Sequence, residues 1–473
     1  MTAPLLVSTT EIVLSAVSEH DNKMANFSPD DGGSLVQVSS GTNSWKGRSL
    51  ISPDRNDFAP RVGFAYQQTS RIVVRGGFAI FYQHHYRYGS ESMLSFNPPY
   101  LVDTTLSQNQ GSTTPVFYLS KGFPISTLDS TSTPLYDIQV RAQDPTQRTG
   151  YVEQTSFGLQ TQLTRTTILS ADYVGNFSHK FARVANLNQG KIAGTDNLGN
   201  PIVVFPYANL NSESQHAFLE YASHSGNGSY NALEISLRHA FADRYSYGVS
   251  YTLSHNIADF NPPINGDYLP QNIYNMSPER SDNALDNRQR FVANGIWALP
   301  IGKGGWVLNE PSHLSNILGG WQVNTIVTLQ TGNPFTITAN DMSETGGHNA
   351  SRANRIGDPF SGATKDPSKY VSGGTGFYIN PASYSNPSVG QFGNTRPFSV
   401  HGPGFKNIDL SLFKTFPITD RMRTEFRAEF FNAFNHANFN HPNSSISDPG
   451  SFGKVYSTVN DPREIQLALK LYF

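Results

Sequence analysis

Residues 421–430, RMRTEFRAEF, alternate strictly between two kinds of side chain. Every second residue from Met422 to Phe430 is apolar or small, and the residues between them carry charges of both signs: Arg421, Arg423, Glu425, Arg427 and Glu429. A period of two places successive side chains on opposite faces of a β-strand. The stretch therefore predicts a strand that separates an apolar environment from a hydrated one.

The same alternation recurs along most of the chain. We expect strands at 59–67, 71–83, 151–163, 165–176, from Ser229 onward, at 245–253, 290–299, 321–330, 406–416, 421–430 and 464–473, with a weaker candidate at 11–17. The total is about twelve, and each is close to the ~9–11 residues that a tilted strand needs to cross a membrane.

The composition of the 473 residues fits such a protein. Only 15% are charged, against about 25% in a typical soluble domain, and 12% are aromatic, which is too many for a disordered chain. No apolar run approaches the ~18 residues of a transmembrane helix. A net charge of −2 without a basic cluster argues against nucleic acid as a partner, and the absence of cysteine excludes a disulfide scaffold.

The expected connections alternate in length. Within strand pairs only a few residues intervene, as at Thr164-Arg165 or Ala242-Asp243, whereas the connections between pairs are long: 84–150, 177–228, 256–289, 331–405 and 434–463. This indicates an all-β, antiparallel transmembrane β-barrel with short periplasmic turns and long extracellular loops. The intermediate connection 301–320 and the C-terminus then lie on the periplasmic side. A soluble sandwich or propeller, the alternative fold, does not predict this alternation.

The final strand has a signal of its own. Its apolar face ends on an aromatic residue at the C-terminus and consists of Ile465, Leu467, Leu469, Leu471 and Phe473. This pattern resembles the C-terminal strand by which the barrel-assembly machinery recognises outer-membrane proteins.

Seven segments, in family order, resemble the barrel of TonB-dependent receptors of the Oar-like group. They are 56–66 (NDFAPRVGFAY), 73–82 (VVRGGFAIFY), 230–237 (YNALEISL), 319–335 (GGWQVNTIVTLQTGNPF), 402–414 (GPGFKNIDLSLFK), 423–439 (RTEFRAEFFNAFNHANF) and 465–473 (IQLALKLYF). The resemblance implies transport of a bulky nutrient, a carbohydrate or a peptide, through a barrel of about 22 strands closed by a plug on which TonB acts.

The chain departs from this family at its beginning. We expect residues 1–53 to form a poorly matching start with one weak strand and a loop, and residues 54–473 to form the C-terminal portion of the barrel. No signal peptide, TonB box or plug is recognisable, so TonB would act only through a plug missing from this chain. The chain is then a fragment of a receptor. The alternatives are a small passive pore and a non-transporting surface or adhesin barrel.

No enzymatic constellation is recognisable, and we expect neither catalysis nor a cofactor. Three groups of residues have side chains that could bind a metal: His84 with His85, His436 with His441, and, as a calcium site, Glu279, Asp282 and Asp286. Adjacent residues of a strand point to opposite faces, the second pair belongs to a turn, and the carboxylates are irregularly spaced. We therefore expect no metal and interpret the carboxylates as solvated loop residues.

The remaining candidates are wall residues. Charged residues that we expect to face the barrel lumen are Arg61, Arg75, Glu234, Arg238, Asp409, Arg421, Arg423, Glu425, Arg427 and Glu429. They would contact a plug or substrate, or simply form cross-strand ion pairs in a hydrated wall. Aromatic residues near strand ends, candidates for the interfacial girdles, are Tyr66, Tyr82, Tyr173, Tyr245, Trp297, Trp321 and Tyr472. The expected partners are outer-membrane lipid, the assembly machinery and an unidentified small-molecule, sugar or peptide substrate, in the outer membrane of a Gram-negative bacterium.

Overall fold

The fold is described here from a computed structural model of the chain. It describes residues 22–30, 32–38, 47, 49–83, 94–101, 115, 118, 120, 140–207, 210, 218–260, 269–302, 304–310, 312–346, 351–419 and 421–473. Among these residues, no helix is both long and apolar enough to span a membrane.

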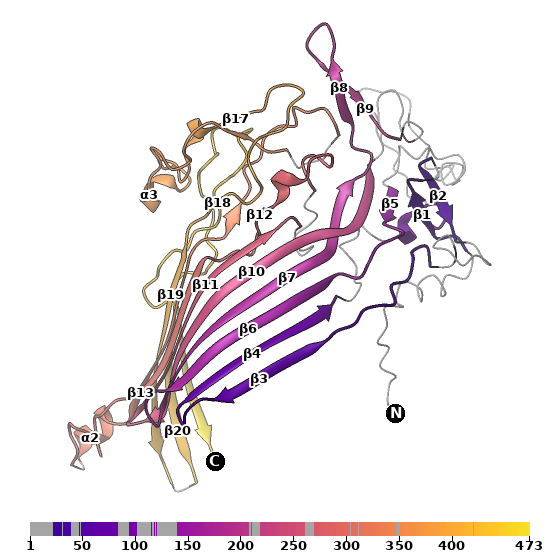
Figure 1. The fold of residues 1–473 in the computed structure, drawn as a ribbon. Coiled ribbons are helices and arrows are strands. Elements are labelled where there is room, and N and C mark those ends of the chain that lie inside the picture. Colours follow the sequence, from indigo (N-terminus) through magenta and orange to yellow (C-terminus); the bar gives the residue numbers. More distant parts are fainter. Residues whose placement is uncertain are drawn as a thin grey trace.

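One antiparallel sheet dominates the structure (Figure 1). Eleven strands follow one another in chain order, each paired with the next: β3 (Arg61–Gln67), β4 (Ile72–Tyr82), β6 (Tyr151–Gln162), β7 (Thr167–Asn186), β10 (Leu219–Ala242), β11 (Tyr245–Ala258), β13 (Gln289–Ala298), β14 (Trp321–Gln330), β19 (Phe405–Pro417), β20 (Arg423–Phe431) and β21 (Glu464–Tyr472). β5 (Val140–Gln143) pairs with β10, and β12 (Ser281–Asp282) with β11. No pairing joins the outermost strands, β3 and β21, within the described part of the chain.

The eleven main strands confirm the prediction from alternation, and the candidate at 11–17 lies outside the described residues. Three strands are clearly longer than expected: β7 runs on to Asn186, β10 starts at Leu219 instead of near Ser229, and β11 runs on to Ala258. The pairing of β7 with β10 continues through register shifts at Gly226. Such bulges break the period of two, so the alternation disappears while the hydrogen-bonded ladder goes on.

Connections of different length lie at opposite ends of the sheet (Figure 1). We call these the short-turn end and the loop end. The shortest turn, between β10 and β11, consists of Asp243 and Arg244, and both have positive φ, as a two-residue hairpin with the right-handed twist requires. α2 (His313–Leu318), in the connection between β13 and β14, and the C-terminus also lie at the short-turn end.

Short strands and helices lie at the loop end. They are β1 (Ala25–Ser28), β2 (Ser34–Gln37), β8 (Lys191–Thr195), β9 (Pro201–Val204), β15 (Pro334–Phe335), β16 (Asn354–Arg355), β17 (Tyr384–Ser385), β18 (Val400–His401), α3 (Pro367–Tyr370), η1 (Leu94–Phe96), η6 (Ser277–Glu279) and η7 (Pro381–Ser383). The hairpin of β1 and β2 falls in a region we expected to be a loop after one weak strand. Strands of four residues are too short for periodicity to reveal them.

Most of the buried apolar residues lie in the connections, and those on strands of the sheet are mainly alanines, such as Ala232 and Ala428. One cluster joins the connection before β19 to the one before β21: Phe335, Ile337, Ala353, Ile379, Tyr384, Val400 and Phe452. A second joins the first hairpin to β5 and the start of β10: Phe27, Val140, Ala142, Leu210 and Leu219. The long connections therefore fold as packed units, because their own apolar side chains bury one another.

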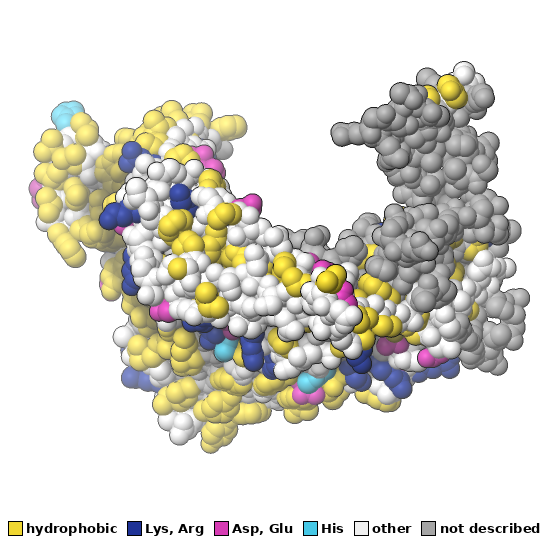
Figure 2. All heavy atoms as spheres, turned by 90° about the horizontal axis from the view of Figure 1, so that it is seen from above, with side chains coloured by type: hydrophobic (Ala, Val, Ile, Leu, Met, Phe, Trp, Pro, Cys, Tyr) yellow, Lys and Arg dark blue, Asp and Glu magenta, His cyan; other side chains and the backbone are white. Residues whose placement is uncertain are grey.

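The ladder sorts the side chains of the sheet into two faces, since directly paired residues point to the same side. The apolar face carries, from β21 to β3, residues such as Leu469, Phe426, Leu412, Val323, Trp297, Leu253, Leu233, Tyr173, Phe157, Val74 and Phe64. Many of these side chains are exposed, for example Leu469 at 72%. Hydrophobic side chains gather along the lower and left edges of the view in Figure 2. The opposite side we call the polar face.

An ion pair on the polar face spans a strand between its partners. Arg75 on β4 and Asp172 on β7 both pair with Gly158 on β6. The guanidinium binds the carboxylate through Nη2, 2.9 Å from Oδ1 and 3.0 Å from Oδ2. A Cβ at Gly158 would collide with Asp172 Oδ1, so only glycine lets the two side chains meet across β6.

We therefore expect Gly158→Val to break the Arg75–Asp172 pair and to lower the free energy of unfolding by about 1 kcal/mol, the value of a good exposed ion pair. Urea unfolding of the detergent-refolded chain measures this. In an Asp172→Ala background the same substitution should cost far less. Gly63→Ala, whose Cβ would have its nearest neighbour at 3.6 Å, is the control. Equal costs in both backgrounds would contradict the bridging role of Gly158.

Candidate functional site

Nine of the ten charged residues predicted to face the lumen share the polar face of the sheet. The register places them together: Arg61, Arg75, Glu234, Arg238, Asp409, Arg423, Glu425, Arg427 and Glu429. Arg421 differs, because it lies before β20, in the turn where Thr419 and Ile418 bond back to Met422. Although the alternation of the sequence includes Arg421, this residue lies outside the strand and belongs to neither face of the sheet.

Charges of opposite sign form a row across the polar face. Arg75, Asp172, Glu234 and Arg290 occupy paired positions from β4 to β13, with Gly158 and Thr252 between them. Asp172 and Arg290 were not among the predicted residues, although the alternation within their strands puts them in phase with those that were. Two arginines flank two carboxylates, so the row is balanced in charge.

Charged side chains near β20 rest on aromatic rings. Arg427 contacts Glu425, and its guanidinium lies 4.5 Å from the ring centre of Phe413. Arg423 lies 4.6 Å from the ring centre of Tyr472. These contacts hold the two guanidinium groups against aromatic rings of the sheet.

A hollow lies on the polar face toward the short-turn end. Its volume is about 810 Å³, and it is lined mainly by Ile168, Arg238, Val292, Ile296, Ile326 and Phe413, with the amides of Asn294 and Asn324. Its size is that of a small-molecule site. Apolar side chains thus interrupt the otherwise polar face at this hollow.

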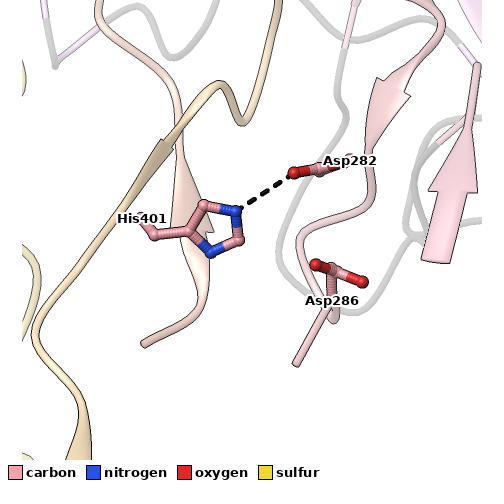
Figure 3. Close-up of side chains that lie close together, drawn as sticks. All are labelled: Asp282, Asp286 and His401. Carbon is pink, nitrogen blue, oxygen red and sulfur yellow. Dashed lines mark hydrogen bonds and ion pairs between the residues drawn. The ribbon is translucent and has the colours of Figure 1, made fainter. Parts of the chain in front are cut away.

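A second group of chemically active side chains lies at the loop end (Figure 3). Asp282 of β12, Asp286 and His401 of β18 place possible ligand atoms within 4.8 Å of one another. Asp282 also receives hydrogen bonds from His255 at 2.9 Å and from Arg288 at 3.0 and 3.1 Å. We call Asp282, Asp286, His401, His255 and Arg288 the loop junction, because it ties two long connections to β11.

The loop junction is an ion-pair cluster. Arg288 Nε donates to Asp286 Oδ2 at 2.8 Å while its Nη2 donates to Asp282, so the guanidinium stands where a cation would bind. Glu279, which the sequence groups with these carboxylates, is instead buried against Arg352, with Nη1–Oε2 at 2.9 Å and Nη2–Oε1 at 2.8 Å. These carboxylates, which we interpreted as solvated loop residues, are thus divided between two different interactions, and Glu279 and Asp286 are buried.

Both ring nitrogens of His401 have oxygen partners. Nδ1 lies 3.0 Å from the carbonyl oxygen of Gly332, and Nε2 lies 3.1 Å from Asp282 Oδ2. The ring therefore connects the segment before β19 to β12. Burial alone would raise the pKa of Asp282, but hydrogen bonds from His255, Arg288 and His401 lower it below the ordinary value of 3.8.

The buried Arg352–Glu279 pair is the centre of a polar network. Arg352 Nε donates to the carbonyl of Thr395 at 2.8 Å, and its backbone N–H donates to Gln271 Oε1 at 2.8 Å. Gln271 in turn bonds Gly393, and its carbonyl accepts from Gln189. Segments far apart in sequence are therefore held in one geometry, since leaving any buried partner unpaired is costly.

The other predicted metal candidates do not converge. His441 stacks on Phe335 with 5.0 Å between ring centres, and burial lowers its pKa. The backbone N–H of His436 donates to Asn432 Oδ1, and Asn432 Nδ2 donates to the backbone carbonyl of His436. His84 and His85 lie outside the described residues.

Comparison with known proteins identifies relatives by family and by fold. Residues 13–466 match the model of a family described as an outer membrane beta barrel domain. A search of curated proteins finds no significant match.

Several solved structures are similar in fold. The outer membrane transporter YddB from Escherichia coli is 9% identical, with a TM-score of 0.39 over 85% of this chain and 38% of that one. The ferric-catecholate import receptor Fiu from E. coli K12 is 10% identical (TM-score 0.37, 87% of this chain, 34% of that one). The siderophore receptor PirA from Acinetobacter baumannii is 11% identical (0.38, 88% and 40%). The chain thus spans 34–40% of the length of these proteins.

We expect Asp282→Asn to open the loop junction, because the amide cannot accept the same charged hydrogen bonds, each worth about 1.5–3 kcal/mol. Hydrogen exchange of the refolded full chain should show at least tenfold faster exchange near residues 282–288 and 399–402. The lowered pKa means that the carboxylate stabilises the junction above pH 3.8 and that this contribution is lost as the pH falls through its folded value.

The wild-type junction should therefore lose protection in acid, whereas Asp282→Asn should be unprotected throughout. Asp341→Asn, which changes a carboxylate that accepts only from the nearby Ser343, is the matched control. Unchanged exchange in Asp282→Asn would show that the junction does not hold the connections.

Proposed function

The chain belongs to the family of outer membrane β-barrel domains, and on that basis we propose that its sheet is part of the wall of an outer-membrane transporter. The apolar face meets lipid, and the polar face lines an aqueous path. The long connections meet the cell exterior, and the short-turn end with the C-terminus meets the periplasm. Transport in this proposal is movement of solute past the wall, without covalent chemistry.

The observation that carries the proposal is the separation of the two faces over all eleven strands. Contiguous apolar patches on soluble monomers rarely exceed a few hundred Å². Here apolar side chains predominate on one face of the sheet, and the large buried clusters lie at the loop end instead. In a bilayer, the exposed apolar face contacts hydrocarbon. The hydrogen bonds between strands pair the backbone N–H and C=O groups, for which lipid offers no partner.

The sequence resemblance extends the proposal to the TonB-dependent, Oar-like receptors. The substrate is then a bulky nutrient, a carbohydrate or a peptide, and TonB acts through a plug. Residues 54–473 supply the C-terminal portion of the barrel. The hollow beside Arg238 and Phe413 and the charge row through Asp172 are the surfaces that a plug or substrate would contact. The barrel-assembly machinery would recognise β21.

Opposite faces of β21 give a direct test of the wall. Leu469→Arg places a charge on the lipid-exposed side and should be clearly destabilising, by at most the about 2–4 kcal/mol that an arginine costs at the bilayer midplane. Ala468→Arg, on the polar face, is the matched control and should cost far less. Unfolding of the two variants from phospholipid vesicles measures the difference. Equal costs would refute the assignment of the faces.

Solute efflux distinguishes a portion of a receptor from a complete passive pore. A chain that supplies only part of a wall should not, after refolding alone, migrate as a heat-modifiable closed barrel or release sugars from vesicles. Rapid efflux by the refolded chain would favour the passive pore. The genomic sequence upstream of Met1 provides the second test. An in-frame plug and TonB box supports the receptor, and a stop codon close to Met1 would contradict it.

A further inference from the structure

The connection between β13 and β14 exposes apolar side chains at the short-turn end. We call residues 304–310 and 312–320 of this connection the foot. Trp306 is 83% exposed and Ile317 is 64% exposed, and Val307, Leu314 and Leu318 are also exposed. Of residues 301–320 only Lys303 and Glu310 carry a formal charge at neutral pH. A turn in water gains nothing from such a composition.

The helix of the foot turns its apolar side outward. Leu314, Ile317 and Leu318 have the spacing i, i+3, i+4, which puts them on one side of α2. Ser315, on the other side, is buried and completes a capping box with Ser312. A surface helix of a soluble protein has the reverse arrangement, with its apolar stripe against the core.

The last turn of α2 is fixed to the apolar face of the sheet. Lys414 of β19 donates from Nζ to the carbonyls of Asn316 and Ile317, each at 2.6 Å, and is only 3% exposed. Trp321 of β14 donates from Nε1 to the carbonyl of Ile317 at 3.2 Å. The ammonium satisfies carbonyls that the end of a helix leaves free and is attracted by its negative pole.

These contacts make the foot continuous with the apolar face. Lys414 is paired with Phe426 and Trp321, and the row continues to Leu469. The Trp321 ring centre lies 5.4 Å from Lys414 Nζ, and that of Phe416 lies 4.8 Å from it. A charge within this row is sheltered by rings and helix carbonyls, as suits the boundary between hydrocarbon and water.

Tryptophan is concentrated at the same corner. The chain has four tryptophans, and the three that the structure describes are Trp297 near the end of β13, Trp306 in the foot and Trp321 at the start of β14. Trp297 pairs with Val323 and with Tyr245 on the apolar face. Tryptophan is enriched at membrane interfaces because its ring is apolar and its N–H is polar.

We propose that the foot is a membrane-interface anchor, with α2 and Trp306 inserted among the headgroups of the leaflet at the short-turn end. This rests on the proposed function, because it requires the apolar face to meet lipid. The occupant is a phospholipid surface: the foot continues the lipid-facing side without a break and has almost no charge with which to select a protein. Insertion is apolar, so it should depend little on salt or on anionic lipid.

Tryptophan quenching in vesicles tests the anchor. Two full-chain reporters keep one tryptophan each, Trp306 or Trp297, with the others changed to phenylalanine. They are refolded into phosphatidylcholine–phosphatidylglycerol vesicles whose acyl chains are brominated at shallow or deep positions. We expect Trp306 to be quenched, and at least twofold more by the shallow bromine than by the deep one. Trp297 should be quenched as well.

The outcomes separate the two proposals. Quenching of Trp297 without quenching of Trp306 would overturn the anchor and leave the wall intact. Absence of quenching at both positions would overturn the wall itself. Quenching of Trp306 that rises with the phosphatidylglycerol fraction and falls with salt would contradict apolar insertion. Quenching that changes with the protein-to-lipid ratio would indicate that a second copy covers the foot and would overturn lipid as its occupant.

Substitutions within the foot give a second test. Leu314→Gln together with Ile317→Gln should at least halve the quenching of Trp306 and shift its emission to the red, while leaving Trp297 unchanged. Both side chains point outward, so the capping box and the bonds from Lys414 stay in place. Glu310→Gln, in the same connection, should change neither signal. Undiminished quenching in the double variant would exclude α2 from the membrane contact.

Discussion

Backbone hydrogen bonding along the ladder from β3 to β21 is the constraint on which the rest of the structure depends. A peptide group that leaves water must find a partner, and in lipid only a helix or a laterally paired strand provides one. Once each strand is paired with its neighbours, side chains are free to differ completely between the faces. The division into an apolar and a polar face and the packing of the large apolar clusters at the loop end both follow from this ladder.

The loop end obeys a different physical rule. Its segments lie in water and must bury their own apolar side chains, as Phe335 and Val400 do, while also satisfying buried polar groups. The Arg352–Glu279 pair is acceptable only because carbonyls and amides complete its hydrogen bonds, since desolvation of two charges otherwise exceeds their attraction. A network that tolerates few alternatives holds the connections in a defined geometry. A preorganised surface loses less entropy on binding a solute than a mobile one does.

Local periodicity and long-range contact explain what the sequence could predict. All eleven main strands could be predicted because each has one apolar and one polar face, which appears in the sequence as an alternation between neighbouring residues. The extension of β10 back to Leu219 was missed because bulges near Gly226 interrupt that period. The loop junction could not be predicted, since Asp282 and His401 are 119 residues apart and only the folded connections bring them together. Glu279 is three residues from Asp282 yet joins Arg352, because the chain changes direction between them.

In the proposed wall, two lysines on the apolar face of β19 mark the two limits of the part of that face that meets hydrocarbon. Lys406 pairs with Leu329 toward the loop end, and Lys414 pairs with Trp321 toward the short-turn end, with Ile408, Leu410 and Leu412 between them on the same face. Eight residues at about 3.3 Å each span about 26 Å along the strand, and a tilt of about 40° reduces this to about 20 Å across a bilayer. That is close to the apolar band of about 25 Å on outer-membrane barrels, since long lysine side chains extend the band at either edge. The charge positions on one strand therefore bracket the membrane independently of the aromatic residues, and they place α2, bonded to Lys414, at its boundary.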